Sequence, residues 1–156
     1  MSIEQNDSRP AENARILIVD DNHYGLRARK TILEQLGHSI IALDCPCAAL
    51  NCFSAERFDL VITDYRMPNM SGARLITQLR EARPGIPVIL ISGFVDTLGL
   101  DEATTGANAV IQKGAHEVTQ MIREVDRLLG RTKPARKPPT PRVGRPPGGP
   151  MSGVAR

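Results

Sequence analysis

Short, uninterrupted runs of branched apolar residues recur along the chain, separated by longer segments of mixed polarity. Runs of this length without polar alternation are typical of strands that are buried on both faces of a parallel sheet. We therefore predict five strands, over residues 15–20, 39–43, 60–64, 88–92 and 109–112.

The segments between these strands carry apolar residues at mixed spacings of three and four, which indicates helices with one buried face. Gly37 ends the first helix and Pro46 opens the second, positions that these two residue types favour. The five predicted helices cover residues 23–36, 46–53, 73–81, 98–105 and 118–129. Regular alternation of strands and helices predicts an α/β fold with a mostly parallel sheet.

Polar side chains follow the predicted strands at the points where the strands end. They are Asp20 and Asp21, Asp64, Ser92, and Lys113. In open parallel sheets, ligands bind beyond the carboxyl ends of the strands. We therefore expect three carboxylates, a hydroxyl and an ammonium group to meet at one edge of the sheet.

Three carboxylates at close range repel one another unless a cation lies between them. Mg²⁺ suits such a site because it takes oxygen ligands and retains waters beside one or two carboxylates and a phosphate. Asp64 is the candidate nucleophile, since a carboxylate can form an acyl phosphate, and Lys113 and the metal would neutralise the phosphoryl oxygens. Ser92 could then bond a phosphoryl oxygen and draw the loop at Gly93 toward the site.

Each of these residues also has an ordinary structural explanation. Asp20 and Asp21 could be the N-cap and dipole partner of the first helix. Ser92 could be a turn serine, and Lys113 a solvated loop lysine. The argument for a site rests on their joint occurrence, in this order, at strand ends.

Composition adds a strong asymmetry of charge. All 17 acidic residues precede residue 131, whereas the last 26 residues carry seven basic residues and are rich in proline. We expect a short disordered lead (1–13), one folded domain (14–130) and a flexible basic tail (131–156). No apolar segment is long enough to span a membrane or to act as a leader peptide, so we expect a cytoplasmic protein. The cysteines Cys45, Cys47 and Cys52 lack partner ligands at zinc-site spacing, which favours reduced structural thiols over metal binding.

Several of these residues form a recognisable set. The set comprises Val19-Asp20-Asp21, Asp64-x-x-Met67-Pro68-x-Met70-x-Gly72, Ser92-Gly93 and Lys113. In these residues the chain resembles the CheY-like receiver domains of response regulators in two-component phosphorelay systems. The resemblance implies a flavodoxin-like, doubly wound sheet of five parallel strands in the order 2-1-3-4-5, with five helices.

The resemblance also implies roles for the residues at the strand ends. Asp64 would be the phosphoacceptor, and Ser92 and Lys113 would be the switch hydroxyl and the phosphoryl-contacting lysine. Asp21, Asp64 and the backbone carbonyl of Arg66 would bind Mg²⁺, with Asp20 acting largely through water. The protein would be a single-domain response regulator, not an enzyme that turns over small substrates. It would take its phosphoryl group from a histidine kinase or a histidine phosphotransfer protein and signal to an unidentified downstream protein.

Two positions depart from the usual receiver pattern. Gly114 follows the lysine where receivers usually have proline, and Val110 stands where they commonly have tyrosine or phenylalanine. Valine cannot carry an aromatic rotamer signal. Phe94, two residues after Ser92, could replace it as a moving aromatic or could simply pack.

Two other functions remain open at this stage. A phosphatase of the haloacid dehalogenase type also uses an aspartyl nucleophile and Mg²⁺. Its signature places that nucleophile after the first strand, with a second aspartate two positions later. The residues after the first strand here are Asp20-Asp21-Asn22, which fail that spacing. The basic tail could contact nucleic acid or an anionic surface, and Gly144-Arg145-Pro146 faintly resembles the core of an AT-hook. The plainer interpretation is a solubilising or tethering tail.

Overall fold

The computed structural model describes residues 13–130. The predicted lead, apart from its last residue, and the predicted basic tail lie outside this range. The strands are β1 (Arg15–Val19), β2 (Ser39–Leu43), β3 (Leu60–Asp64), β4 (Val88–Ser92) and β5 (Ala109–Gln112). The helices are α1 (His23–Gln35), α2 (Pro46–Ala55), α3 (Gly72–Ala82), α4 (Val95–Leu98), α5 (Glu102–Thr105) and α6 (Glu117–Leu128). None of these helices is long and apolar enough to cross a membrane.

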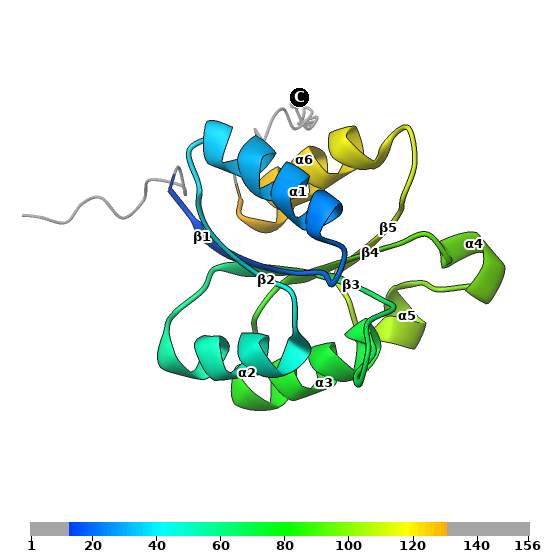
Figure 1. The fold of residues 1–156 in the computed structure, drawn as a ribbon, viewed down its shortest axis with the longest axis horizontal. Coiled ribbons are helices and arrows are strands. Elements are labelled where there is room, and N and C mark those ends of the chain that lie inside the picture. Colours follow the sequence, from blue (N-terminus) through cyan, green and yellow to red (C-terminus); the bar gives the residue numbers. More distant parts are fainter. Residues whose placement is uncertain (1–12, 131–156) are drawn as a thin grey trace, which may run out of the picture.

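The strands form one parallel sheet in the order β2-β1-β3-β4-β5 (Figure 1). This result confirms the predicted fold class and strand order. Four of the predicted strands have the observed bounds, and β1 ends at Val19, one residue earlier than predicted. Asp20 therefore begins the loop that leaves the sheet, which places its side chain at the sheet edge.

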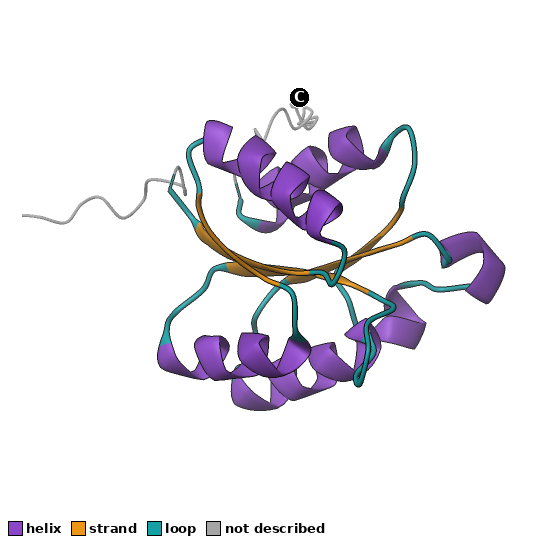
Figure 2. Cartoon of the chain, in the orientation of Figure 1, coloured by secondary structure: helices purple, strands orange, loops and turns teal. Residues whose placement is uncertain are grey.

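Helices cover both faces of the sheet, as the unalternating strands require. α1 and α6 lie on one face, and α2, α3 and α5 lie on the other (Figure 2). Alternate strand residues point to opposite faces, so Ile16 and Ile18 pack toward α1 and α6, whereas Leu17 and Val19 pack toward α2 and α3.

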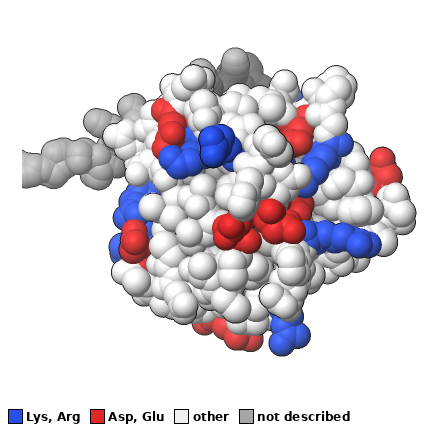
Figure 3. Space-filling model, in the orientation of Figure 1, with Lys and Arg blue, Asp and Glu red and all other residues white. Residues whose placement is uncertain are grey.

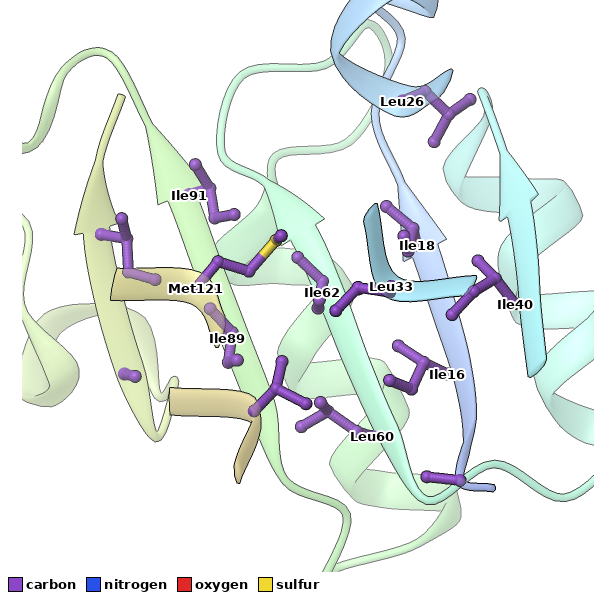
Figure 4. Close-up of a cluster of buried hydrophobic side chains, with 14 residues drawn as sticks. Ile16, Ile18, Leu26, Leu33, Ile40, Leu60, Ile62, Ile89, Ile91 and Met121 are labelled. Carbon is purple, nitrogen blue, oxygen red and sulfur yellow. The ribbon is translucent and has the colours of Figure 1, made fainter. Parts of the chain in front are cut away.

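The core beneath α1 and α6 is built almost wholly from aliphatic side chains. Figure 4 shows Leu33 of α1 and Met121 of α6 inserted among the isoleucines of the strands. Both helix residues are fully buried. Val118, the first residue of the helix predicted over residues 118–129, lies in the first turn of α6 and is 42% exposed.

The connection between β4 and β5 differs from the prediction of a single helix over residues 98–105. It forms two short helices, α4 and α5, which gives six helices where five were expected. Gly99 ends α4 in the left-handed conformation (φ 64°), and Asp101 starts α5 with a capping box to Thr104. The prediction of a helix in this connection was right in type but wrong in extent, because Gly99 divides the segment and α4 begins at Val95.

Candidate functional site

The polar residues predicted at the strand ends do meet at one edge of the sheet. Parallel pairing places Asp64 beside Ile91 and Ser92 beside Gln112, so the ends of β3, β4 and β5 lie level with one another. The backbone N–H of Lys113 donates to the carbonyl of Ser92 at 2.9 Å, which continues this ladder one residue past β5.

Asp20, Asp21 and Asp64 form an acidic cluster. One carboxylate oxygen from each residue lies within 4.8 Å of the others. Asp20 is fully buried and Asp64 is 7% exposed, whereas Asp21 is open to solvent. Figure 3 draws one face of the molecule, on which acidic side chains gather near the middle with basic side chains beside them. The donor set is all oxygen, which is the set that hard divalent cations prefer.

Lys113 reaches into the acidic cluster from the end of β5. Its Nζ lies 3.1 Å from Oδ1 of Asp64 and 3.9 Å from Oδ2 of Asp20. Its side chain remains about one-third exposed, at 31%. A single ammonium group therefore faces two of the three carboxylates of the cluster.

The environment of Asp64 favours its neutral form more than water does. Burial raises the pKa of the Asp64 carboxyl group, and repulsion from Asp20 raises it further. The hydrogen bond and the attraction from Lys113 oppose this rise, but the pKa remains above its ordinary value. A cation that neutralised the repulsion would favour the ionised, nucleophilic carboxylate.

The alternative explanation of Asp20 and Asp21 as helix caps does not hold. The N-cap of α1 is Asn22, whose side chain accepts from the backbone N–H groups of Tyr24 and Gly25 at 3.0 and 3.2 Å. Asp20 instead holds the loop, because its Oδ1 accepts from the N–H of Asn22 at 2.9 Å.

Gly72 permits the close approach of α3 to the end of β3. A Cβ atom at this position would lie 2.2 Å from the carbonyl oxygen of Asp64, which no packing can accommodate. The N–H of Gly72 donates to the carbonyl of Tyr65 at 2.7 Å and closes the turn. The glycine of the sequence motif is therefore needed for space at the backbone of Asp64.

Ser92 ends β4, and Arg66 lies two residues after Asp64, the last residue of β3. The hydroxyl of Ser92 is buried and accepts from the N–H of Phe94 at 2.9 Å, so in this structure it is used within its own loop. The guanidinium of Arg66 lies 4.3 Å above the ring of Phe94. A hollow of about 490 Å³ lies beside Asp21 and is lined by Asp21, Tyr65, Arg66, Met67, Pro68, Ser71 and Leu98.

Arg29 is part of the site and was missed by the sequence analysis. Its Nη1 donates to Oδ2 of Asp20 at 2.6 Å, and its Nε donates to Oε2 of Glu117, in α6, at 2.8 Å. A signal was present, because Arg29 lies three residues after Leu26 and four before Leu33, on the apolar face of α1. An arginine at such a position requires a buried carboxylate partner.

Gln112 was also missed. Its Nε2 donates to the carbonyl of Gly93 at 3.1 Å, and its Oε1 accepts from the N–H of Asp96 at 3.2 Å. The side chain therefore joins the end of β5 to the loop that contains Ser92 and to the first turn of α4. No pattern along the sequence indicated this contact, since a strand-end glutamine is most often solvated.

The two departures from the receiver pattern have structural counterparts. Val110 packs against the core on the side of α2 and α3. Gly114 has a φ of 153°, which proline cannot adopt because its ring holds φ near −65°. The chain after Lys113 therefore follows a path that depends on glycine.

The cysteines do not assemble a metal site within residues 13–130. Cys45, Cys47 and Cys52 are free thiols, and the group within residues 13–130 that could hold a metal ion is the acidic cluster. Burial, together with the nearby carboxylate of Glu56, raises the pKa of the Cys52 thiol and keeps it protonated.

Comparison with protein families supports the geometry. The family model described as "Response regulator receiver domain" matches residues 16–125, which is more than two thirds of the chain. Among curated proteins, the virulence sensor protein BvgS of Bordetella pertussis is 38% identical over 100 residues, which is 62% of this chain but 8% of BvgS. The putative two-component response regulator ARR21 of Arabidopsis thaliana is 35% identical over 104 residues, or 65% of this chain and 17% of that protein. The chain thus spans less than a fifth of these relatives.

Solved structures show the same fold. The response regulator protein TrrA from Thermotoga maritima, in complex with Mg²⁺-BeF, has a TM-score of 0.66 and 26% identity over 74% of this chain and 99% of that one. The BeF₃-activated DrrB receiver domain has a TM-score of 0.67 and 28% identity over 76% of this chain and 99% of that domain. With five parallel strands in the order 2-1-3-4-5 and a sequence match across residues 16–125, the chain belongs to the response regulator receiver domain family.

Proposed function

We propose that this protein is a single-domain response regulator that accepts a phosphoryl group at Asp64. The observation that carries the proposal is the setting of Asp64. It is a buried carboxylate at the end of β3, 3.1 Å from the ammonium of Lys113 and within 4.8 Å of two further carboxylates. Family membership supports a role in phosphorelay signalling.

The acidic cluster fits Mg²⁺ in the chemistry of its ligands. Asp21 and Asp64 would bind the ion directly with the backbone carbonyl of Arg66. Asp20 would act through water, because its Oδ1 and Oδ2 already accept from Asn22 and Arg29. When bound, the ion would neutralise the cluster and the oxygens of the incoming phosphoryl group.

The proposed reaction moves one phosphoryl group from nitrogen to oxygen. The donor is a phosphohistidine of a histidine kinase or a histidine phosphotransfer protein. The N–P bond breaks, an O–P bond forms at the Asp64 carboxylate, and the imidazole keeps the electron pair and takes up a proton. Lys113 stabilises the phosphoryl oxygens by charge, and the buried setting of Asp64 limits access of water to the acyl phosphate.

Output would pass through the loop after β4. To reach a phosphoryl oxygen, the Ser92 hydroxyl must turn from its bond with the N–H of Phe94. That movement would pull on the carbonyl of Gly93, which Gln112 holds. Because Gln112 also contacts Asp96 in α4, the displacement would reach the surface that an unidentified downstream protein reads. Val110 offers no aromatic ring for this task.

The proposal also covers where the protein works. The phosphohistidine of the proposed donor proteins is made from ATP. Because ATP is found in the cytoplasm, we place this protein there. The basic tail would tether or solubilise the domain, with weak contact to nucleic acid or an anionic surface as the alternative.

Phosphodonor labelling tests the assignment of Asp64. The full chain is incubated with acetyl phosphate and Mg²⁺, and the intact mass is measured. The wild type should gain one phosphoryl group, and Asp64→Asn should gain none. The matched control is Asp44→Asn, which removes an exposed aspartate bound to His23 and should label as the wild type does. Labelling that survives Asp64→Asn would overturn the assignment.

A further inference from the structure

Arg29 occupies a position where an arginine is costly. It lies on the buried face of α1 between Leu26 and Leu33, and its side chain is only 6% exposed. A buried guanidinium is tolerated only when carboxylates pair with it and its donors are satisfied. Its location beside the acidic cluster therefore requires an explanation beyond helix packing.

The contacts of Arg29 join the acidic cluster to α6. Nη1 donates to Oδ2 of Asp20 at 2.6 Å, and Nε donates to Oε2 of Glu117 at 2.8 Å. Burial lowers the pKa of the Arg29 guanidinium, but the bonds to Asp20 and Glu117 outweigh it, and the pKa is raised overall. Arg29 is therefore a permanent positive charge in direct contact with the acidic cluster.

Gly25 makes room for this contact. A Cβ atom at Gly25 would lie 3.2 Å from Nη1 and 3.4 Å from Nη2 of Arg29, and 3.4 Å from Oδ2 of Asp20. Glycine destabilises the interior of a helix relative to alanine. The backbone of Gly25 has no positive φ that would call for glycine. A methyl group at Gly25 would therefore crowd the guanidinium by a few tenths of an ångström.

We propose that Arg29 is a positioning residue that acts as a built-in counter-ion of the acidic cluster. It holds the Asp20 side chain and neutralises part of its charge, so that the cluster stays assembled without a metal. The same charge weakens Mg²⁺ binding, because the ion and the guanidinium compete for the field of Asp20. The inference rests on the proposed function only in taking Mg²⁺ as the ion that the cluster binds.

The test is a calorimetric Mg²⁺ titration of the full chain and its variants at one pH and ionic strength. Arg29→Met removes the charge with little change in side-chain length, and the dissociation constant should fall about tenfold. Arg29→Lys keeps the charge, because the carboxylates of Asp20 and Glu117 favour the ammonium form, and it should bind Mg²⁺ within about twofold of the wild type. The matched control is Arg27→Met on the exposed face of α1, which should change the constant less than about twofold because of screening.

Gly25→Ala provides a second variant in case Arg29→Met folds poorly. Its Cβ displaces the guanidinium, which is the flexible end of its side chain, while alanine favours the helix. The dissociation constant for Mg²⁺ should fall about two- to threefold, because Asp20 is then only partly neutralised.

Thermal unfolding with and without Mg²⁺ separates this role from a purely structural one. As a counter-ion, Arg29 stabilises mainly the metal-free state, so saturating Mg²⁺ should raise the Tm of Arg29→Met by more than that of the wild type. A purely structural ion pair between α1 and α6 would lower the Tm equally in both conditions and leave the dissociation constant unchanged.

The outcomes distinguish the inference from the proposed function. If the wild type binds Mg²⁺ and is labelled, while Arg29→Met and Gly25→Ala bind Mg²⁺ no more tightly than the wild type, the counter-ion role is wrong and the proposed function stands. If the wild type neither binds Mg²⁺ nor accepts phosphate, both are overturned.

Discussion

Two sides of the candidate site differ in how they are held. The acidic side, formed by Asp20, Asp21 and Asp64, is held by buried ionic contacts. The switch side, formed by the loop from Ser92 to Asp96, is held by the partly exposed amide of Gln112. On the acidic side, Asp20 is locked by Arg29 and by the N–H of Asn22. On the switch side, Gly93 is exposed and the neighbouring α4 has only four residues. Under the proposed function, this difference would suit phosphoryl transfer to fixed charges and signalling to a segment whose contacts can be exchanged at low cost.

Glycine substitutions should give the largest difference between the two sides in the free energy of unfolding. Gly72→Ala would place Cβ 2.2 Å from the carbonyl oxygen of Asp64, so the backbone must shift. We expect a loss of about 2–4 kcal/mol in the free energy of unfolding, measured with urea. Gly93→Ala on the switch side meets no atom within 4 Å and should change stability by less than about 0.5 kcal/mol. Equal losses in the two variants would contradict the comparison.

Asp64→Asn should have the next largest effect on the free energy of unfolding, and it should raise rather than lower it. Removing one carboxylate from the cluster relieves its repulsion, and without metal the protein should gain about 1–2 kcal/mol at neutral pH. Because the folded-state pKa of Asp64 is raised, its contribution to stability is fully present below the unfolded pKa and is lost as pH rises through the folded value.

The stability gap between Asp64→Asn and the wild type should therefore widen as the pH rises from acid to neutral. Urea unfolding across this range in the presence of a chelator measures the gap. Asp44→Asn, at an exposed site, serves as the control and should show little pH-dependent gain. A gap that shrinks toward neutral pH would show that Asp64 is not destabilised by its neighbours.

Gln112→Ala should have a smaller effect on stability than Asp64→Asn and a local effect on dynamics. Loss of the contacts with Gly93 and Asp96 should cost about 0.5–1 kcal/mol. Amide hydrogen exchange over residues 93–98 should become faster, while phosphodonor labelling at Asp64 persists. Gln35→Ala, at the exposed end of α1, is the matched control. Unchanged exchange in Gln112→Ala would mean that this amide does not hold the switch side.

Much of the fold could be predicted because it depends on short-range patterns. The strand cores are continuous runs of Ile, Val and Leu, and such runs need no knowledge of neighbours to be recognised. The segment over residues 95–105 was harder, since Gly99 and the Asp101 cap divide it at a point that apolar spacing does not reveal.

The candidate site was predictable in its charged core and less so around it. Asp20, Asp21, Asp64 and Lys113 lie at strand ends, and parallel topology alone brings strand ends together. The placement of Ser92 followed from the same rule, although its hydroxyl bonds within its own loop. Arg29 and Gln112 were missed because they reach the site across 9 and 19 residues of chain, to Asp20 and Gly93, through side-chain geometry.

The sequence by itself determined the parallel α/β architecture and the residues that gather at its carboxyl edge, because hydrophobic periodicity and strand-end position are local properties of the chain. Only the tertiary structure decided how the charges of that edge are balanced. Several features exist only after the helices have packed: the burial of Asp20, the space left by Gly25 and the approach of Glu117 from α6. As a result, one of the two adjacent aspartates is held by Arg29 and the other is open to solvent.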